Sequence, residues 1–454
     1  MAYLPRYICL LIVLTSCWNI QALAQNNSYP NVSEKNIDHI FSRYNRSDMP
    51  GCVVGVVSHG ELIFAKGYGS ANLDYGIPLM PDSRIMIASI SKQFTAAALL
   101  MLEQEGKLDM DEDIRTYIPE MPDLGYPITS RQIMYHTSGL RDIYSLLDLA
   151  DIGLDNTTTT QQALALLSRQ QGLNFRPGAE HLYSNSGYFL ISVLVKNITG
   201  KSLREYTDEH FFKPIGMNST HFHDDTRLIV PDRVISYRPT VNGPGRFYRD
   251  NMDRIGARGL ITTIEDMALW DRNFIENKSN LQNFTERMTE TGFVLDGRPL
   301  NYAAGLRVNQ YRSIKTIGHG GNYMGFRSKY MQFPEQQLSV ITFCNMSNIN
   351  PTTLTHRVAD LYLKEVFVNK LMNYTGHYRN ESFDTSYDIL MDDGKLCLTR
   401  GSKDKDHLEW RKDDQFRAGL YNINFNRDNQ GKIDQIGIRT SSTGNITFKK
   451  SKVP

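Results

Sequence analysis

The sequence predicts an α/β (α+β) fold, in which one sheet collects strands from both ends of a large domain and a small all-β domain follows. Runs rich in β-branched and aromatic residues, typical of strands, stand near both ends of the large domain. They occupy residues 52–57, 62–65, 315–318, 328–333 and 338–343. The chain between them carries helical periods, which favours a helical region inserted into the sheet domain.

Length and composition limit the class of protein. The 454 residues suggest two or three domains, and 41% hydrophobic with 22% charged residues is ordinary for a globular chain. The formal net charge is +1, which gives no field for attracting nucleic acid or an anionic membrane. We therefore expect neither as a partner, and oligomeric state is not visible in the sequence.

Residues 1–24 are predicted to be a signal peptide. An apolar run at 8–14, too short to span a bilayer, precedes an Ala-Leu-Ala cleavage pattern at 22–24. A periplasmic or extracellular protein is therefore expected. A buried N-terminal helix is one alternative. A second is lipid anchoring through Cys17, because Leu14-Thr15-Ser16-Cys17 resembles a lipobox.

The mature chain would keep three cysteines, Cys52, Cys344 and Cys397, without C-x-x-C spacing. That number excludes a disulfide-framework domain and a cysteine zinc site. Glycosylation sequons would mark surface sites if the host uses them. They include Asn26, Asn31, Asn45, Asn156, Asn197 and Asn218.

Two helices are predicted in the middle of the chain. Residues 94–105 are apolar nearly all round and precede Gly106, which predicts a buried helix. Residues 186–195 predict a second helix that ends near Gly200.

The helical period disappears after about residue 365. Alternating residues such as those at 421–425, with turn signals at 393–394 and 428–431, predict a small all-β domain over 366–454. The main domain would then span 25–365. The alternative is a few strands that extend the main sheet.

Ser89-Ile90-Ser91-Lys92 is an S-x-x-K pattern at the start of the predicted buried helix. Residues three apart share a helix face, so the Ser89 hydroxyl and the Lys92 amine can meet. A desolvated lysine held neutral can act as the base that a serine nucleophile needs. The alternative is a capping serine beside a solvated lysine, which the apolar run after Lys92 disfavours.

Tyr183-Ser184-Asn185 is a Y-x-N pattern just before the second helix. A tyrosine near cations can lose its proton far below its usual pKa of about 10, and Asn185 can orient the lysine or a substrate amide. The alternative is a buried tyrosine beside an asparagine N-cap.

His319-Gly320-Gly321 stands at the end of a predicted strand. Glycine lets a substrate approach the backbone closely, and a free N–H there can stabilise an oxyanion. The alternative is a glycine turn with a surface histidine.

The order and separation of these three motifs resemble those of penicillin-recognising serine hydrolases. The most similar branch comprises class C β-lactamases, D-Ala-D-Ala carboxypeptidases, D-aminopeptidases and family VIII esterases. The resemblance covers about residues 35–365, and the C-terminal domain is more weakly similar to an appended lipocalin-like barrel. Connecting segments that add to it are 87–95, 136–140, 175–178, 214–217 and 259–263.

The resemblance implies a β-lactamase/transpeptidase-like fold: a five-stranded antiparallel sheet flanked by helices, an all-helical lobe, and a cleft between them. It implies that Ser89 is acylated and the acyl-enzyme then hydrolysed, with no metal and no cofactor. Lys92 and Tyr183 would share the roles of general base and general acid. The implied substrate-binding residues are Asn185, His319, Gly320, Gly321 and Asn322, and the N–H groups of Ser89 and Asn322 would form the oxyanion hole.

One departure from the family pattern bears on the substrate. Class C β-lactamases carry Lys-Thr-Gly where this chain has His319-Gly320-Gly321. A histidine that is mostly neutral at pH 7 offers a substrate carboxylate no permanent charge, so efficient β-lactam hydrolysis is not the first expectation. Arg258 is a candidate for that charge, with a structural salt bridge as the alternative.

The family's strand order would also place Cys52 and Cys344 on neighbouring strands. We expect two free buried thiols there, with a disulfide as the alternative.

The expected function is that of an exported serine hydrolase that cleaves an amide or ester, either a D-amino-acid peptidase or carboxypeptidase or an esterase. The partner would be a small-molecule or peptide substrate: a D-amino-acid peptide, an ester or a β-lactam. One alternative is a β-lactamase. Another, from a different class, is a non-catalytic penicillin-binding or ligand-binding protein on the same fold. Residues 141–171 are expected to overhang the cleft.

Overall fold

The computed structural model describes residues 32–152, 158–246, 253–400 and 405–451. The predicted signal peptide with Cys17 lies outside these residues, as do the sequons at Asn26, Asn31 and Asn156. Within the described ranges, no helix combines the length and the apolar character needed to cross a bilayer.

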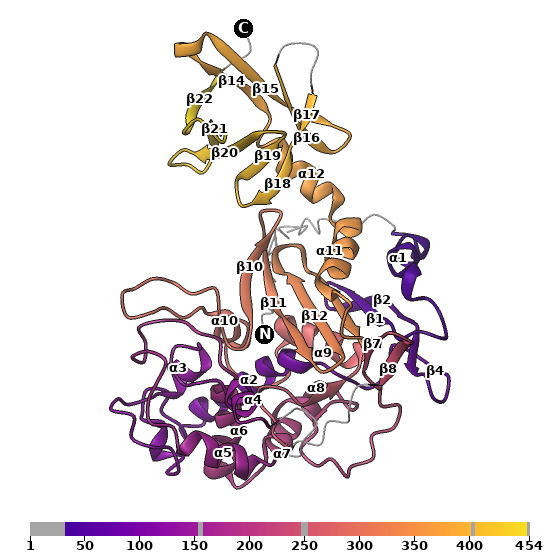
Figure 1. The fold of residues 1–454 in the computed structure, drawn as a ribbon, viewed down its shortest axis with the longest axis vertical. Coiled ribbons are helices and arrows are strands. Elements are labelled where there is room, and N and C mark those ends of the chain that lie inside the picture. Colours follow the sequence, from indigo (N-terminus) through magenta and orange to yellow (C-terminus); the bar gives the residue numbers. More distant parts are fainter. Residues whose placement is uncertain (1–31, 153–157, 247–252, 401–404, 452–454) are drawn as a thin grey trace, which may run out of the picture.

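A six-stranded antiparallel sheet forms the centre of the large domain, in the order β10-β11-β12-β13-β1-β2 (Figure 1). The five predicted strand segments all fall in it. The resemblance implied five strands, and β10 adds a sixth at one edge. Its sequence is largely polar and partly exposed, so it carries no continuous apolar signal. The strands are β1 (Cys52–Ser58), β2 (Glu61–Tyr68), β10 (Arg307–Tyr311), β11 (Ile314–Tyr323), β12 (Phe326–Phe333) and β13 (Leu338–Cys344).

Helices cover both faces of this sheet. α1 (Glu34–Phe41) and α11 (Pro351–Tyr362) lie on one face and α9 (Ile264–Glu276) on the other. Side chains alternate between the two faces along a strand. Val54 and Val56 accordingly join the core with α1 and α11, and Val53 joins the core with α9. β1 is therefore buried on both faces, which explains its uninterrupted apolar run.

The helical lobe packs around α2 (Lys92–Gln104), which is buried on nearly every side. The helix predicted over 186–195 is α6 (Asn185–Thr199). It ends at Gly200, which adopts the left-handed conformation with φ 73°. The remaining helices of the lobe are α3 (Ser130–Met134), α4 (Ile143–Leu149), α5 (Thr160–Ser168), α7 (Leu203–Thr207), α8 (Lys213–Ile215) and α10 (Phe284–Thr289).

Three small sheets complete the part of the large domain that the structure describes. They consist of β3 (Ser70–Asn72) with β4 (Ile77–Pro78), of β7 (Tyr237–Thr240) with β8 (Gly243–Arg246), and of β5 (Ile85–Met86), β9 (Leu260–Thr262) and β6 (His221–Phe222).

The C-terminal residues form a near-closed β-barrel with a sheet of its own, in the order β17-β16-β15-β14-β22-β21-β20-β19-β18. The alternative, strands that extend the main sheet, is therefore wrong. α12 (Lys364–Met372) runs across residue 366 and leads into the barrel. The strands are β14 (Gly376–Asn380), β15 (Thr385–Asp392), β16 (Lys395–Thr399), β17 (Lys405–His407), β18 (Glu409–Lys412), β19 (Gln415–Ala418), β20 (Tyr421–Arg427), β21 (Ile433–Arg439) and β22 (Ile446–Ser451).

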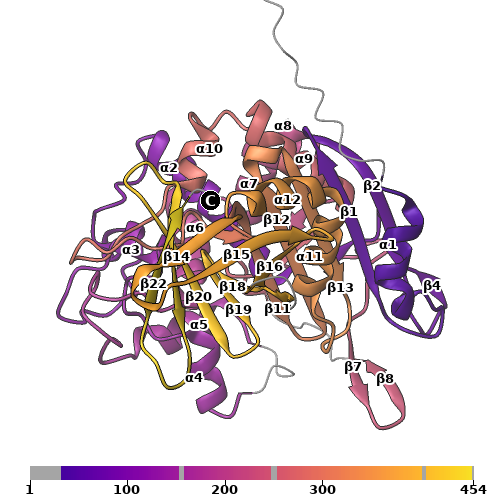
Figure 2. The ribbon, with the colours of Figure 1, turned by 90° about the horizontal axis from the view of Figure 1, so that it is seen from above.

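The barrel meets the main sheet at the β10–β11 turn. Ser313 Oγ of this turn donates to the carbonyl of Asp413 at 3.4 Å, and Lys370 Nζ of α12 donates to the carbonyl of Ser313 at 2.5 Å. Figure 1 shows the barrel beyond the tip of the β10–β11 hairpin, with α12 leading to it from α11, and from above its strands β18 and β19 project over β11 (Figure 2). The barrel is thus held at the turn between the edge strand β10 and β11, the strand that carries the third motif.

Cys52 and Cys344 form a disulfide, so the expectation of two free buried thiols was wrong. The two residues are direct register partners on β1 and β13, and their Cα atoms lie 4.0 Å apart. Direct opposition brings the two sulfur atoms within bonding distance, whereas the sequence alone leaves the register undetermined. Among the described cysteines, Cys397 alone is free, and it is buried.

Replacing both Cys52 and Cys344 with serine is expected to lower the free energy of unfolding by about 2 to 4 kcal/mol, because a long loop loses its crosslink. Urea unfolding with and without reductant measures this, and reductant should destabilise the wild type alone. Alkylation in denaturant without reductant should label only Cys397 of the three. Labelling of Cys52 and Cys344 as well would contradict the disulfide.

Candidate active site

Ser89 lies in a short 3-10 turn, η2 (Ala88–Ser91), directly before α2. Ala88 has a positive φ of 50°, a strained conformation for a residue with a Cβ that persists only when its surroundings hold it. Ser91 helps to stabilise this conformation, because its Oγ donates to the Ala88 carbonyl at 2.6 Å and accepts from the Leu260 N–H at 3.1 Å. The turn leaves Ser89 partly exposed at a cleft.

Lys92 places a buried amine against Ser89. Its Nζ lies 3.2 Å from Ser89 Oγ, and it donates to Asn185 Oδ1 at 2.8 Å and to the Ala257 carbonyl at 2.9 Å. Burial lowers the pKa of Lys92 to about 7, against the opposing effect of Asp142. A substantial fraction of this amine is therefore neutral near pH 7, and the alternative of a solvated lysine is wrong.

Asn185 is the first residue of α6, and its side chain faces the cleft rather than capping the helix. Ser184 occupies the N-cap position. Asp142 Oδ2 accepts from the Asn185 side-chain amide at 2.8 Å and from its backbone N–H at 2.6 Å. Since the amide nitrogen donates to Asp142, the amide oxygen is turned toward Lys92. Asp142 thus fixes which end of the amide meets the amine.

Tyr183 lies with its ring beside Lys92, whose Nζ is 4.7 Å from the ring centroid. Burial raises the pKa of Tyr183 well above its usual value, although Ser89 and Arg307 act in the opposite direction. The prediction that nearby cations favour a tyrosinate here is therefore wrong, because desolvation of the anion outweighs their attraction. The hydroxyl remains a proton donor in the resting site.

His319 is buried in the middle of β11. The prediction that it stands at the end of a strand is therefore wrong, and so is the alternative of a surface histidine in a glycine turn. Its Nδ1 lies 2.6 Å from the Gly320 carbonyl and its Nε2 lies 3.2 Å from the Tyr302 hydroxyl. A carbonyl can only accept, so Nδ1 carries the proton and Nε2 accepts from Tyr302. Burial lowers the pKa of His319 to about 3, which keeps the ring neutral, as the sequence predicted for pH 7.

Gly321 brings β11 close to the nucleophile turn. A Cβ at this position would lie 2.3 Å from the Ile87 carbonyl and 2.1 Å from Ser328 Oγ, so no other residue fits. Gly320, Gly321 and Asn322 all line the cleft beside Ser89. The structure thereby brings together all the residues that the three motifs predicted for the site.

The cleft has a volume of about 650 Å³ and a positive lining. Three arginines border it, and no described residue that lines it is acidic. The Arg307 guanidinium makes no hydrogen bond and no ion pair with the described residues. It lies 5.8 Å from the Tyr183 ring centroid. The other two are Arg258 and Arg327, of which Arg327 donates to two backbone carbonyls.

Arg258, the predicted candidate for carboxylate binding, is almost fully buried at the cleft wall. Its Nε donates to the Tyr144 hydroxyl at 2.6 Å, and its guanidinium lies 4.1 Å from the Tyr323 ring centroid. These contacts fix its side chain at the cleft wall. Tyr144 belongs to the segment 141–171, which therefore contributes to the cleft wall.

Sequence reasoning missed Asp142 and Arg307. Asp142 carries a local signal, because an aspartate directly before the apolar segment of α4 is a typical N-cap, and its Oδ1 accepts from two N–H groups there. Arg307 has no such signal. It reaches the cleft only because β10 pairs with β11, where Arg307 lies opposite Gly318.

The comparisons with known proteins agree with this geometry. The family model described as Beta-lactamase matches residues 37–363. The chain belongs to the Beta-lactamase family. It is a serine hydrolase of that family, on the fold that the resemblance implied.

Similar curated proteins are D-aminopeptidases. Those of Gluconobacter oxydans and Cereibacter sphaeroides are each 30% identical to this chain, over 298 and 297 residues. The aligned region is 65% of this chain but 56% and 57% of theirs, so the chain spans little more than half their length.

Two solved structures share the fold. The octameric penicillin-binding protein homologue from Pyrococcus abyssi aligns with a TM-score of 0.64 and 20% identity, over 91% of this chain and 99% of the other. The D-amino acid amidase from Ochrobactrum anthropi aligns with a TM-score of 0.60 and 21% identity, over 74% and 99%.

If neutral Lys92 is the base, kcat/KM should rise with pH through about 7, the pKa of Lys92. Asp142→Asn should move this rise to lower pH, because the Asp142 charge raises that pKa. It should also reduce kcat/KM about 10-fold or more, since a hydrogen bond to a charged group is lost. A pH–rate profile on an uncharged ester measures both effects.

Asp148→Asn, on the exposed face of the same helix, is the control and should leave the profile unchanged. A reduced rate for Asp142→Asn with an unmoved profile would indicate that Asp142 only supports the fold.

Proposed function

We propose that the protein hydrolyses amide bonds through an acyl-enzyme on Ser89. The observation that carries this proposal is the contact of the buried Lys92 amine with the Ser89 hydroxyl at 3.2 Å. A serine becomes nucleophilic when a neighbouring base takes its proton, and burial lowers the pKa of Lys92 to about 7. An amine with that pKa can serve as the base at neutral pH.

Acylation would begin when Lys92 Nζ takes the Ser89 proton and Ser89 Oγ attacks the substrate carbonyl carbon. The resulting oxyanion would be stabilised by the backbone N–H groups of Ser89 and Asn322. The bond to the leaving amine then breaks, and that nitrogen receives a proton from Tyr183, whose hydroxyl is protonated at rest. Tyr183 regains a proton from the Lys92 ammonium, which restores both groups.

Deacylation would repeat these steps with water in place of Ser89. Lys92 takes a proton from water, the hydroxide attacks the acyl carbon, and Ser89 leaves with the proton returned to it. No metal or cofactor enters this scheme, because the side chains supply each proton transfer.

The relatives and the cleft together suggest the substrate class. Curated relatives are named D-aminopeptidases, and one neighbour of the same fold is named a D-amino acid amidase, so we propose amides or short peptides of D-amino acids. The described lining of the cleft holds three arginines and no carboxylate. Within this class, the charge favours a short peptide that places its C-terminal carboxylate there over an amino acid amide, which offers only a free ammonium.

We also propose that the protein is exported, with residues 1–24 as a signal peptide and Cys17 as an alternative lipid anchor. The Cys52–Cys344 disulfide supports an oxidising compartment, since such bonds are rare in the cytosol.

Ser89→Ala should abolish hydrolysis of D-amino acid amides, with a loss in kcat of at least about 10³-fold, because no acyl-enzyme can form. Intact-mass spectrometry after addition of an activated acyl ester or a penicillin should show an adduct on Ser89 in the wild type only. Ser145→Ala, at an exposed position of α4, is the control. Unchanged turnover by Ser89→Ala on every substrate would falsify the proposal.

Arg307→Gln tests the preference for an anionic substrate. The pair to compare is a D-amino acid dipeptide with a free C-terminal carboxylate and the same dipeptide with that carboxylate amidated. We expect kcat/KM to fall about 10-fold or more for the carboxylate alone, because a charge-assisted hydrogen bond is lost. Arg298→Gln, on an exposed loop, is the control. An equal loss of kcat/KM on both substrates would show that Arg307 does not recognise the substrate carboxylate.

A further inference from the structure

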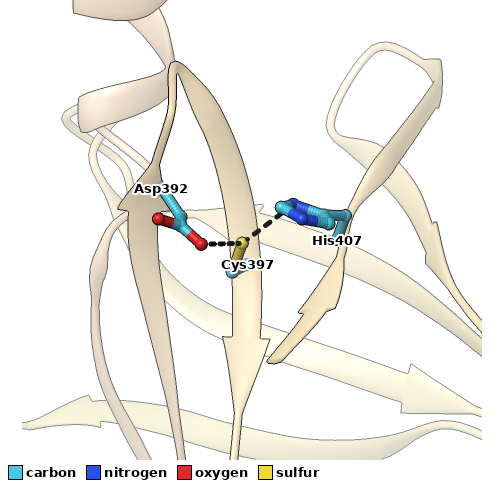
Figure 3. A group of neighbouring side chains, drawn as sticks. All are labelled: Asp392, Cys397 and His407. Carbon is cyan, nitrogen blue, oxygen red and sulfur yellow. Dashed lines mark hydrogen bonds between the residues drawn. The ribbon is translucent and has the colours of Figure 1, made fainter. Parts of the chain in front are cut away.

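A second group of chemically active side chains lies in the barrel, on strands that carry no part of the hydrolase site. Cys397 of β16 and His407 of β17 are direct register partners, and Asp392 ends the neighbouring strand β15. Their side chains converge from three adjacent strands (Figure 3). Cys397 Sγ lies 3.0 Å from His407 Nδ1 and 4.0 Å from Asp392 Oδ2.

The surroundings of Cys397 are unusual for a buried thiol. Leu396 and Leu398 on either side of it pack into the barrel core, so by strand alternation Cys397 faces the opposite side of the sheet. It is nevertheless fully buried. A buried free cysteine ordinarily behaves as a small hydrophobic side chain. Here an imidazole and a carboxylate enclose the sulfur, and all three are metal-ligand groups.

We propose that Asp392, Cys397 and His407 form a binding site for a divalent thiophilic cation, with Zn²⁺ as the favoured ion. One thiolate, one imidazole and one carboxylate make a donor set that zinc accepts and that calcium and magnesium do not prefer. Three protein ligands would leave the fourth tetrahedral position for water or another small ligand.

The geometry permits such an ion with small movements. The three donor atoms all lie within 4.8 Å of one another. With the two measured separations from Sγ, one ion can lie about 2 to 2.4 Å from each atom, close to the bond lengths of zinc to oxygen, nitrogen and sulfur. His407 is exposed and Asp392 is partly exposed, so these two side chains can adjust around the fixed sulfur.

The same contacts disfavour a cysteine nucleophile. In a Cys-His-Asp relay the carboxylate would orient the imidazole, but Asp392 contacts the sulfur instead and pairs with Lys405 at 3.2 Å. Burial and Asp392 raise the pKa of the Cys397 thiol, which makes it a poor nucleophile. A metal ion would replace the thiol proton directly and offset both effects.

Binding of the cation would release one proton, from the Cys397 thiol. The Cys397 S–H bond breaks, a sulfur–metal bond forms, and the proton leaves to solvent. Asp392 gives up its ion pair with Lys405 when it binds the ion, so Lys405 competes with the metal. His407 also lines a cavity of about 350 Å³ between α12 and the barrel, so an ion here would lie at the edge of that cavity.

Titration of the full-length protein with Co²⁺ tests the site, because a thiolate–cobalt bond gives a charge-transfer absorption band. We expect one equivalent of Co²⁺ to produce this band and Zn²⁺ to displace it. Cys397→Ser should remove the band, and His407→Gln should weaken binding by about 10-fold or more. Lys405→Met should strengthen binding, because it removes the competing ion pair.

His377→Gln is the matched control, since His377 pairs with Asp388 in the same barrel without a thiol. Ser89→Ala should bind Co²⁺ as the wild type does, which separates this test from that of the hydrolase. Circular dichroism confirms that each variant is folded. Absence of the band in the folded wild type, or a band that survives Cys397→Ser, would overturn the proposal.

Discussion

The candidate active site depends on a buried lysine amine held against a serine hydroxyl. An ammonium group in this position would be strongly destabilised without acceptors, and Asn185 and the Ala257 carbonyl supply them. Asp142 offsets part of the desolvation. The balance between burial and these partners places the pKa of Lys92 near neutrality. The fold supplies that balance by bringing the end of η2, the start of α6 and the segment before β9 to one point.

Close backbone packing holds the nucleophile turn in place. β11 passes so near to η2 that only glycine fits at position 321, and it packs directly against Ala88, whose backbone has a positive φ. The neutral His319 then adds bulk and a hydrogen bond to this strand without adding charge. Among the described residues that line the cleft, the permanent positive charges are therefore the three arginines, and none of them belongs to the strand motif.

Local sequence patterns predicted the parts of the site that lie within a few residues of one another. Ser89 and Lys92 are three residues apart, and the apolar helix after them revealed their burial. The features that the sequence did not predict depend on how distant segments pack together in the fold. Arg307 reaches the cleft through strand pairing, the disulfide depends on the register of β1 with β13, and the protonation of Tyr183 depends on how much water its neighbours exclude. The Asp392–Cys397–His407 group likewise exists only once three strands are paired.

The choice among substrates has to rest on the cleft, because one fold supports several reactions. A D-aminopeptidase must accommodate the free ammonium of its substrate, and a carboxylate is the usual partner for such a group. The described lining offers arginines instead. Two of the three are held by neighbouring groups, Arg258 by aromatic side chains and Arg327 by backbone carbonyls. The Arg307 guanidinium has no hydrogen bond or ion pair to any described residue, so its N–H donors are the ones open to an incoming carboxylate.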